Sequence, residues 1–359
     1  MKILRVGSFP TIEKPGVGLH ASELCSINSA RTIYLTSKEV SDRPIVEGNF
    51  KLFEFGNPIK KRTSEKKLFI QFFFILRRIS NLIRFSLYGV WLLFSKRVDI
   101  VHIHSPMYII IALAGFFTNK RVYITFHGTD FHRIKKSRLY KMFGRIFTKV
   151  FAISPDMLPI LSEIHGNKSV ILVKNGIHLD IFKNQNAVRK KQIIAVGEFK
   201  IEKGFEYLIE AFSNLKKNII FKEYVLLIVG DGLLRDGLED QIRSLDMSNS
   251  IYLLGRKNRE ELIELYNQSD VFVLSSISEG FPKVLLEALS CGCKVVSTDV
   301  GAVRSVLPDI KLARPKISED LEKSLSDCII NKNRPNVDFN KFTWGSVREE
   351  YNKEYTRIK

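Results

Sequence analysis

The sequence contains few cysteines, and their spacing is not that of a metal site. The four are Cys25, Cys291, Cys293 and Cys328. None forms a CxxC pair, and no second set of His or Cys ligands accompanies Cys291 and Cys293, which argues against a zinc site and favours reduced, structural cysteines. The apolar start at residues 1–7 is too short for a signal peptide. We therefore expect a cytoplasmic protein.

An uncharged window of membrane-spanning length is also missing from the apolar stretch at residues 68–94. Arg77, Arg78 and Arg84 interrupt this stretch, so no window of roughly 18 uncharged residues remains in it. The sequence therefore predicts one or two amphipathic helices here and no transmembrane helix.

Acidic residues are scarce in the first half of the chain. Residues 1–180 contain 28 Lys and Arg against 12 Asp and Glu, whereas residues 181–359 contain 28 against 26. Basic residues gather at 60–67, directly before the apolar stretch, which has more bulky side chains than one core-facing stripe needs. Because such a surface attracts anionic headgroups, the sequence predicts contact with an anionic membrane surface. The alternative is an ordinary core helix with a solvated basic face.

Nucleic acid is a second partner that a basic chain could bind, because Lys and Arg neutralise phosphates without sequence specificity. The sequence has no spacing typical of a nucleic-acid-binding module. Its basic residues accompany bulky aliphatic side chains instead of aromatic residues spaced for base stacking. We expect no nucleic-acid partner.

Length and hydrophobic patterning indicate two α/β domains. A chain of 359 residues, 45% of them hydrophobic, is too long for one ordinary core. Short β-branched runs alternate with helical segments in both halves, which is typical of parallel sheets in Rossmann-like domains. The expected strands are 1–7, 100–104, 122–126, 192–196, 225–229, 251–253, 271–274 and 294–297. With a linker at 183–191, the domains are expected at 1–183 and 184–342.

The most informative segment places Glu279 and Glu287 eight positions apart around a glycine turn. An apolar run at 271–276 precedes the turn and a helical apolar pattern follows from Val284, so the expected order is strand, turn and helix. Unpaired amides at a helix start attract phosphate or sugar hydroxyls, and a nearby carboxylate can accept hydrogen bonds from a ribose diol. Two glutamates at this spacing also occur on ordinary solvated helix faces.

Glu279 and Glu287 resemble the E-x7-E motif of the family 4 retaining glycosyltransferases, which have the GT-B fold of two Rossmann-like domains. Other segments resemble the family in the expected order over nearly the whole chain. In the first half they are Pro15-Gly16-Val17-Gly18, His127-Gly128-Thr129-Asp130 and Lys174-Asn175-Gly176-Ile177. In the second half they are Val196-Gly197 with Lys203-Gly204, Val229-Gly230-Asp231-Gly232, Leu254-Gly255 and Thr298-Asp299-Val300-Gly301. Residues 343–359 resemble the closing helix, which in this family packs on the N-terminal domain.

The resemblance implies transfer of a sugar from a nucleotide diphosphate sugar to an acceptor hydroxyl, with retained anomeric configuration. No D-x-D occurs in the chain, so we expect no metal clamp for the diphosphate and no other cofactor. Fixed donors must then stabilise the charge on the leaving diphosphate. Lys203 would supply a point charge, together with backbone amides at 16–18 and 280–284. Arg256 follows the family's base-binding loop and is included as a weaker candidate.

The resemblance also implies roles for three side chains. Glu279 would bind hydroxyls of the donor sugar and Glu287 those of the ribose. His127 would face the donor sugar, although a lone histidine at a strand end is often a hydrogen-bonded structural residue. The expected catalytic residues are His127, Lys203 and Glu279, and the expected donor-binding residues are Gly16, Gly18, Arg256, Gly280, Phe281, Pro282, Lys283, Val284 and Glu287.

Three positions depart from the family pattern. Glu198 stands where the family has an arginine, Ser305 where it has a glutamate and His178 where it has an aspartate. A carboxylate that faced the phosphates would weaken donor binding. We expect Glu198 to point away, with Lys200 in the arginine's place; the alternative is altered donor handling.

These observations together predict a peripheral membrane glycosyltransferase on the cytoplasmic face of the cell membrane. It would use a nucleotide sugar and modify a glycan or lipid-linked acceptor in surface polysaccharide biosynthesis, the acceptor being inferred only from the basic and apolar stretch. Two alternatives keep the same fold. One is a non-catalytic sugar-nucleotide-binding protein, suggested by Glu198. The other is a sugar-nucleotide epimerase, whose acid and base residues the sequence does not identify.

Overall fold

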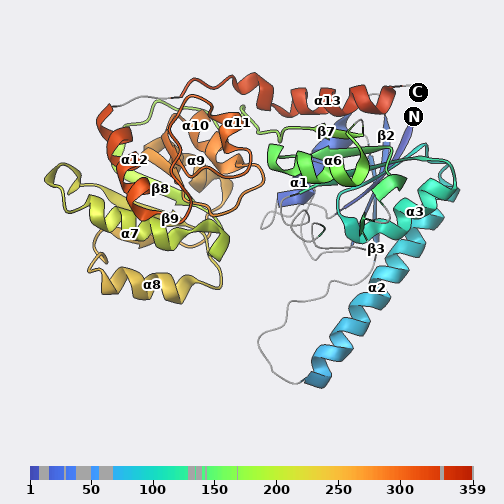
Figure 1. Ribbon diagram of the computed structural model, residues 1–359, viewed down its shortest axis with the longest axis horizontal. Coiled ribbons are helices and arrows are strands. Elements are labelled where there is room, and N and C mark those ends of the chain that lie inside the picture. The colour runs from blue at the N-terminus through green and yellow to red at the C-terminus, as the bar shows by residue number, and fades with distance from the viewer. Residues whose placement is uncertain are drawn as a thin grey trace. The chain divides into compact units, whose positions relative to one another are not determined.

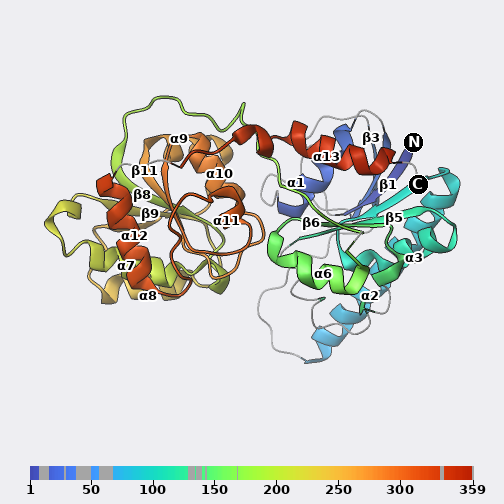
Figure 2. The same ribbon diagram turned by 45° about the horizontal axis from the view of Figure 1, so that its top comes forward.

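The computed structural model divides the chain into two compact units, Met1–Val173 with Gly345–Lys359, and Lys174–Trp344 (Figures 1 and 2). We call them unit 1 and unit 2 and describe each on its own. The structure describes residues 1–7, 16–27, 30–37, 50–55, 68–127, 134, 140–141, 144–167, 169–331 and 335–357. For residues 16–19, 37, 50, 54–55 and 68–78 it describes the backbone only. The predicted motif residues Pro15 and 128–130 and the basic cluster at 60–67 lie outside the described residues.

Unit 1 contains a seven-stranded parallel sheet with the strand order β3-β2-β1-β4-β5-β6-β7. Its strands are β1 (Lys2–Val6), β2 (Arg31–Ser37), β3 (Phe50–Phe55), β4 (Ile100–Ile103), β5 (Arg121–Phe126), β6 (Lys149–Ala152) and β7 (Val170–Leu172). Its helices are α1 (Gly16–Glu23), α2 (Leu68–Ser95), α3 (Ile109–Phe117), α6 (Leu158–His165) and, at the end of the chain, α13 (Trp344–Thr356).

The two faces of the unit 1 sheet are covered differently, because alternate residues of a strand point to opposite faces. Val101 and Val122 are paired in register and pack against α3 on one face. Arg5 and His102 are paired in register on the other face, where Arg5 Nη1 lies 3.2 Å from the hydroxyl of Tyr355 in α13. Figure 2 shows α1 and α13 on one side of this sheet and α2, α3 and α6 on the other.

Unit 2 contains a five-stranded parallel sheet with the strand order β10-β9-β8-β11-β12. Its strands are β8 (Lys190–Val196), β9 (Val225–Val229), β10 (Ile251–Leu253), β11 (Ser269–Leu274) and β12 (Lys294–Ser297). Its helices are α7 (Phe205–Leu215), α8 (Arg235–Ser244), α9 (Arg259–Gln268), α10 (Lys283–Ser290), α11 (Val303–Val306) and α12 (Ser318–Asn331). A buried core joins the sheet to α7, α8 and α12 and includes Phe205, Phe212, Leu238, Leu321 and Leu325.

These two parallel α/β units confirm the predicted fold class. Apolar β-branched runs form the strands because both faces of a parallel sheet are covered by helices. The stretch expected as one or two helices forms the single helix α2. In the part of the chain that the structure describes, no helix is long and apolar enough to span a membrane.

The boundary between the units falls at Val173, whereas the sequence analysis placed it after residue 183. The intervening segment packs on unit 2. The Ile177 amide donates to the Phe342 carbonyl at 2.8 Å, and the Gln185 amide donates to the Asn267 side chain at 2.7 Å. The end of the expected linker also has regular structure, because Lys190 and Lys191 begin β8. Polar composition alone did not distinguish this packed segment from a free linker.

Candidate active site

The candidate site lies at the carboxyl edge of the unit 2 sheet. The chain runs outward from β8 to β10 and then returns to place β11 beside β8, so the strand order reverses between these two strands. Ligands of open parallel sheets bind at this kind of switch point. Lys203 follows β8 and Glu279 follows β11. The fold therefore brings together two residues that are 76 positions apart.

Lys203 and Glu279 form an ion pair. Lys203 Nζ donates to Glu279 Oε2 at 2.5 Å, and the two side chains are 23% and 18% exposed. The Ser276 hydroxyl lies 3.4 Å from the same carboxylate oxygen. The aliphatic part of Lys203 rests on Gly197, where an added Cβ would be 3.2 Å from Lys203 Cδ. A cation and a carboxylate are thus held at the edge of the sheet by packed backbone.

Two left-handed glycines allow the site loops to approach one another. Gly204 has φ +58°, and a Cβ there would be 2.5 Å from the Ser275 carbonyl oxygen. Gly301 has φ +53°, and its Cβ would be 2.1 Å from the Glu279 carbonyl oxygen. Only glycine fits both the positive φ and these contacts. These two glycines allow the Lys203-Gly204 and Thr298–Gly301 segments to pack closely against residues 275–280, the segment that contains Glu279.

The predicted donor-binding turn, residues 280–284, leads into α10. The Gly280 carbonyl accepts from the Ala302 amide at 3.0 Å, and the Lys283 amide donates to the Phe281 carbonyl at 3.0 Å. Phe281 is buried against Phe342, with ring centroids 6.0 Å apart. Pro282 is the residue before the helix, and Val284 is partly exposed in its first turn. The turn is therefore fixed to its surroundings at both ends.

Glu287 lies in the second turn of α10 and is partly buried. Desolvation raises the pKa of its carboxyl group to about 7, and the electrostatic effects of Lys283, Arg259 and His178 act in the opposite direction. Lys283 Nζ also lies 5.7 Å from the centre of the Trp344 ring. Burial thus favours the neutral form of this acid more than it would for an exposed glutamate.

Glu198 forms an ion pair with Lys200, with 2.6 Å between Oε2 and Nζ. Both side chains are about half exposed. The backbone turns sharply here, because the Lys200 amide donates to the Glu198 carbonyl at 2.8 Å. The charge of Glu198 is therefore balanced locally. Arg256, the weaker candidate for donor binding, follows Gly255 and has an exposed side chain. It is far along the chain from Glu198 and Lys200.

Three predicted residues belong to unit 1. Gly16 and Gly18 lie in the first turn of α1, where amides have no intrahelical partner. His127 directly follows β5 and is buried. Its ring lies 5.3 Å from that of His20 and 6.0 Å from that of His104, centroid to centroid.

A buried polar cluster lies beside His127. Arg5 Nη1 is 3.0 Å from His102 Nδ1 and 3.3 Å from His104 Nε2. His102 Nδ1 is also 2.6 Å from the Tyr355 hydroxyl of α13. The pKa values of His102 and His104 are both well below the usual value of 6.5. Burial is the main cause, and nearby positive charge is the second. The cluster therefore joins α13 to the sheet through neutral imidazoles and one guanidinium group.

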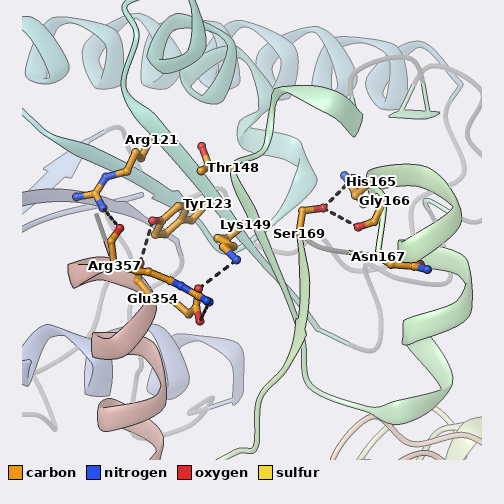
Figure 3. Close-up of a pocket in the computed structure, with 10 residues that line it drawn as sticks. All are labelled: Arg121, Tyr123, Thr148, Lys149, His165, Gly166, Asn167, Ser169, Glu354 and Arg357. Carbon is orange, nitrogen blue, oxygen red and sulfur yellow. Dashed lines mark hydrogen bonds and ion pairs between the residues drawn. The ribbon is translucent and has the colours of Figure 1, made fainter. Parts of the chain in front are cut away.

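A pocket of about 660 Å³ in unit 1 lies at the opposite, amino-terminal edge of the sheet (Figure 3). Arg121 Nη1 donates to the Tyr355 carbonyl at 2.7 Å, the Tyr123 hydroxyl donates to the Glu354 carbonyl at 3.1 Å, and Lys149 Nζ is 3.2 Å from Glu354 Oε2. These groups hold the last turn of α13 to the starts of β5 and β6. The position and these contacts indicate an anchoring role for the lining residues.

Sequence reasoning missed several residues that the fold places around the expected ones. Ser276 approaches Glu279, whereas Arg259 and Trp344 surround Glu287 and Lys283. Ser276 ends the strand run before the turn, so its position at a strand end was a usable signal. Arg259 and Trp344 are distant in sequence, and no local pattern indicated them.

Two family models match the chain. The one described as Glycosyltransferase Family 4 matches residues 55–181, and the one described as Glycosyl transferases group 1 matches residues 177–340. The chain belongs to glycosyltransferase family 4. The prediction drawn from the ordered motifs is therefore confirmed, and so is the prediction that the protein is a transferase.

The glycosyltransferase is similar to characterised and uncharacterised proteins along much of its length. It is 26% identical over 368 residues to the uncharacterized glycosyltransferase MJ1178 of Methanocaldococcus jannaschii, covering 99% of this chain and 94% of that protein. It is 26% identical over 215 residues to N-acetylgalactosamine-N,N'-diacetylbacillosaminyl-diphospho-undecaprenol 4-alpha-N-acetylgalactosaminyltransferase of Campylobacter jejuni, covering 56% of this chain and 57% of that protein.

A solved structure shares the fold. HepE of Anabaena in complex with UDP superposes with a TM-score of 0.72 and 15% identity over 100% of both chains. HepE has also been solved with UDP-glucose. This likeness, with the two parallel-sheet units, shows that the glycosyltransferase has the predicted GT-B fold.

Proposed function

We propose that this glycosyltransferase transfers a sugar from a nucleotide diphosphate sugar to an acceptor hydroxyl at the carboxyl edge of unit 2. The observation that carries the proposal is the Lys203–Glu279 ion pair at the reversal of strand order, with Glu287 in the helix that follows. A cation and two carboxylates in this arrangement suit a ligand with a diphosphate, a sugar and a ribose. The complexes of HepE with UDP and with UDP-glucose support a donor of this class.

Lys203 is proposed to stabilise the charge that develops on the leaving diphosphate. A charged group that is already in position when negative charge develops on the diphosphate needs no reorganisation. Such electrostatic stabilisation is usually the largest contribution to the rate enhancement of an enzyme. In the absence of ligand, Glu279 holds the ammonium group at the sheet edge. When a donor binds, a hydroxyl of its sugar can donate to Glu279 while Lys203 turns toward the phosphates. Amides of 280–284 and of the first turn of α1 are the proposed backbone donors.

Glu287 is proposed to accept hydrogen bonds from the ribose hydroxyls, and His127 to contact the donor sugar. Arg256 is proposed as a weaker contact to the base. The local ion pair between Glu198 and Lys200 supports donor binding despite the loss of the family arginine, because it leaves no uncompensated carboxylate. We propose that no metal takes part and that the anomeric configuration is retained.

The proposed acceptor is a glycan or a lipid-linked oligosaccharide in surface polysaccharide biosynthesis, reached by an enzyme that lies on the cytoplasmic face of the cell membrane. Support comes from the Campylobacter jejuni relative, whose name specifies a diphospho-undecaprenol substrate. Further support comes from the basic, apolar character of residues 60–97.

The test is a panel of nucleotide sugars supplied with polyprenyl-diphosphate-linked acceptors, with the product examined by proton NMR. We expect one donor to be consumed and the new glycosidic bond to have the anomeric configuration of that donor. Inversion would refute the retaining mechanism. Free monosaccharide isomers without a glycosidic product would instead indicate an epimerase.

A further inference from the structure

Helix α2 has two apolar faces, and only one of them is packed. The packed face includes Phe85, Leu92 and Leu93, which are buried, and Gly89, where an added Cβ would be 2.4 Å from Ile111 of α3. The other face has five large side chains that are 47% to 62% exposed: Ile79, Ile83, Leu87, Trp91 and Phe94. Steps of four and three residues place them on one side of a helix. We call these five residues the α2 stripe.

The α2 stripe is an extended surface that lies mainly in the carboxyl-terminal half of α2. Only Ile79 belongs to the amino-terminal half, which extends beyond the sheet and beyond α3 (Figure 1). The Trp91 ring stacks on Tyr88, with centroids 5.4 Å apart. Isolated exposed apolar residues are ordinary, but a continuous row of this length marks an interaction site.

Basic residues predominate in the sequence around the α2 stripe, and the first acidic residue after α2 is Asp99. The sequence has no Asp or Glu between Glu65 and Asp99, and none between Asp99 and Asp130. Arg84 lies exposed among the stripe residues, and Lys96 and Arg97 follow the end of α2. An occupant of this surface must therefore be apolar at its centre and negatively charged at its margin.

We propose that the α2 stripe docks on an anionic lipid bilayer, with its side chains at the boundary between headgroups and acyl chains and the basic residues at the phosphates. This deepens the proposed function and rests on it, because a lipid-linked acceptor would be presented at the same surface. Helices with an apolar face, tryptophan and flanking Lys or Arg bind bilayers in this way. A second copy of the chain fits less well, since two such faces would oppose like charges.

The two tryptophans of the chain provide a direct probe. Trp91 is 52% exposed, whereas Trp344 is 3% exposed. We expect phosphatidylcholine vesicles that contain phosphatidylglycerol to shift the tryptophan emission to shorter wavelength, and brominated acyl chains to quench it. The variant Trp91→Phe should show neither response, because only Trp344 then emits. A vesicle response that persists in this variant would overturn the proposal.

Binding strength is tested with the double variant Ile83→Gln, Leu87→Gln. Both side chains are about half exposed, so the change removes membrane contact without opening the core. We expect partition onto anionic vesicles to weaken by about tenfold or more at an unchanged unfolding temperature. The matched control is Ile219→Gln, Ile220→Gln in unit 2, which changes two side chains that are 73% and 59% exposed and should bind as the parent does.

Three results would contradict the proposal: equal vesicle binding by parent and double variant, equal binding to vesicles without phosphatidylglycerol, or a concentration-dependent dimer that only the double variant abolishes. Affinity for a nucleotide sugar, measured on the same preparations by calorimetry, separates this claim from the donor claim. Vesicle binding without nucleotide-sugar binding would support membrane docking of the α2 stripe and contradict the proposed use of a nucleotide-sugar donor.

Discussion

Glu287 is the residue whose behaviour should depend most on pH. Desolvation raises the pKa of its carboxyl group to about 7, so below this pH the free enzyme has mostly a neutral acid there. A neutral acid is a weaker acceptor for a ribose diol than a carboxylate is. Donor affinity should therefore rise as the pH increases through about 7 and level off above it. Calorimetric titrations of the parent should show this rise, and Glu287→Gln should show a flat profile.

The same residue should contribute substantially to donor affinity. Loss of a hydrogen bond to a charged group costs about 1.5–3 kcal/mol, which corresponds to roughly 10-fold to 150-fold weaker binding of the donor by Glu287→Ala. An unchanged dissociation constant in a folded variant would remove Glu287 from the ribose site.

Lys203 and Glu198 differ in their surroundings, and their substitutions should differ accordingly. Lys203 lies at the sheet edge with Glu279, whereas Glu198 is half exposed and paired with Lys200. We expect Lys203→Ala to reduce kcat by about 100-fold to 1000-fold, because a donor to the leaving group is lost. Glu198→Ala should change kcat only a few-fold. A larger loss for Glu198→Ala than for Lys203→Ala, measured by release of nucleoside diphosphate, would contradict the role proposed for Lys203.

At this scale the sequence could predict residue types but not their contacts. Lys203, Glu279 and Glu287 were selected from motifs, and the roles given to them stay proposals. The ion pair between Lys203 and Glu279 could not be predicted, because it depends on the return of β11 to the side of β8. The electrostatic effect of Arg259 on Glu287 could not be predicted either, because the two residues lie in different helices, α9 and α10, that the fold brings together.

The elements of unit 2 were predicted more closely than its linker. The expected strands 225–229, 251–253 and 294–297 match β9, β10 and β12, because buried parallel strands are short apolar runs that end in turn residues. The start of β8 was missed, since Lys190 and Lys191 are exposed at the beginning of an otherwise buried strand. The polar side chains of Lys190 and Lys191 indicate that these residues are exposed, but they do not show that the backbone already forms the hydrogen bonds of a strand.

Gly204 should be essential to the element that carries Lys203. A side chain there would combine a left-handed φ, which costs about 1–2 kcal/mol, with a clash against the Ser275 carbonyl. We expect Gly204→Ala to lower the free energy of unfolding by at least this amount in urea denaturation. The control is Gly237→Ala in α8, where an added Cβ meets nothing within 4 Å and should stabilise by about 0.5–1 kcal/mol. Equal effects of the two changes would contradict the packing described at Gly204.

At the scale of the whole molecule, the first and last parts of the chain meet in the buried cluster of unit 1. Its histidines have a lowered pKa in the folded protein, so below about pH 6.5 the unfolded chain binds protons that the folded chain does not. The stability that depends on neutral His102 and His104 is complete above this pH and decreases as the pH falls. We expect scanning calorimetry to show a lower unfolding temperature for unit 1 at pH 5 than at pH 7.5. An unfolding temperature that rises on acidification would show that these histidines are not buried as described.

The central claim for the whole enzyme is transfer from a nucleotide sugar by fixed protein charges. The most direct measurement is the release of free nucleoside diphosphate from a panel of nucleotide sugars, with acceptor present, before and after treatment with a chelator. We predict release from at least one donor at a rate that the chelator leaves unchanged. Loss of release with the chelator and recovery with added divalent metal would contradict the account, and so would the absence of release from every nucleotide sugar.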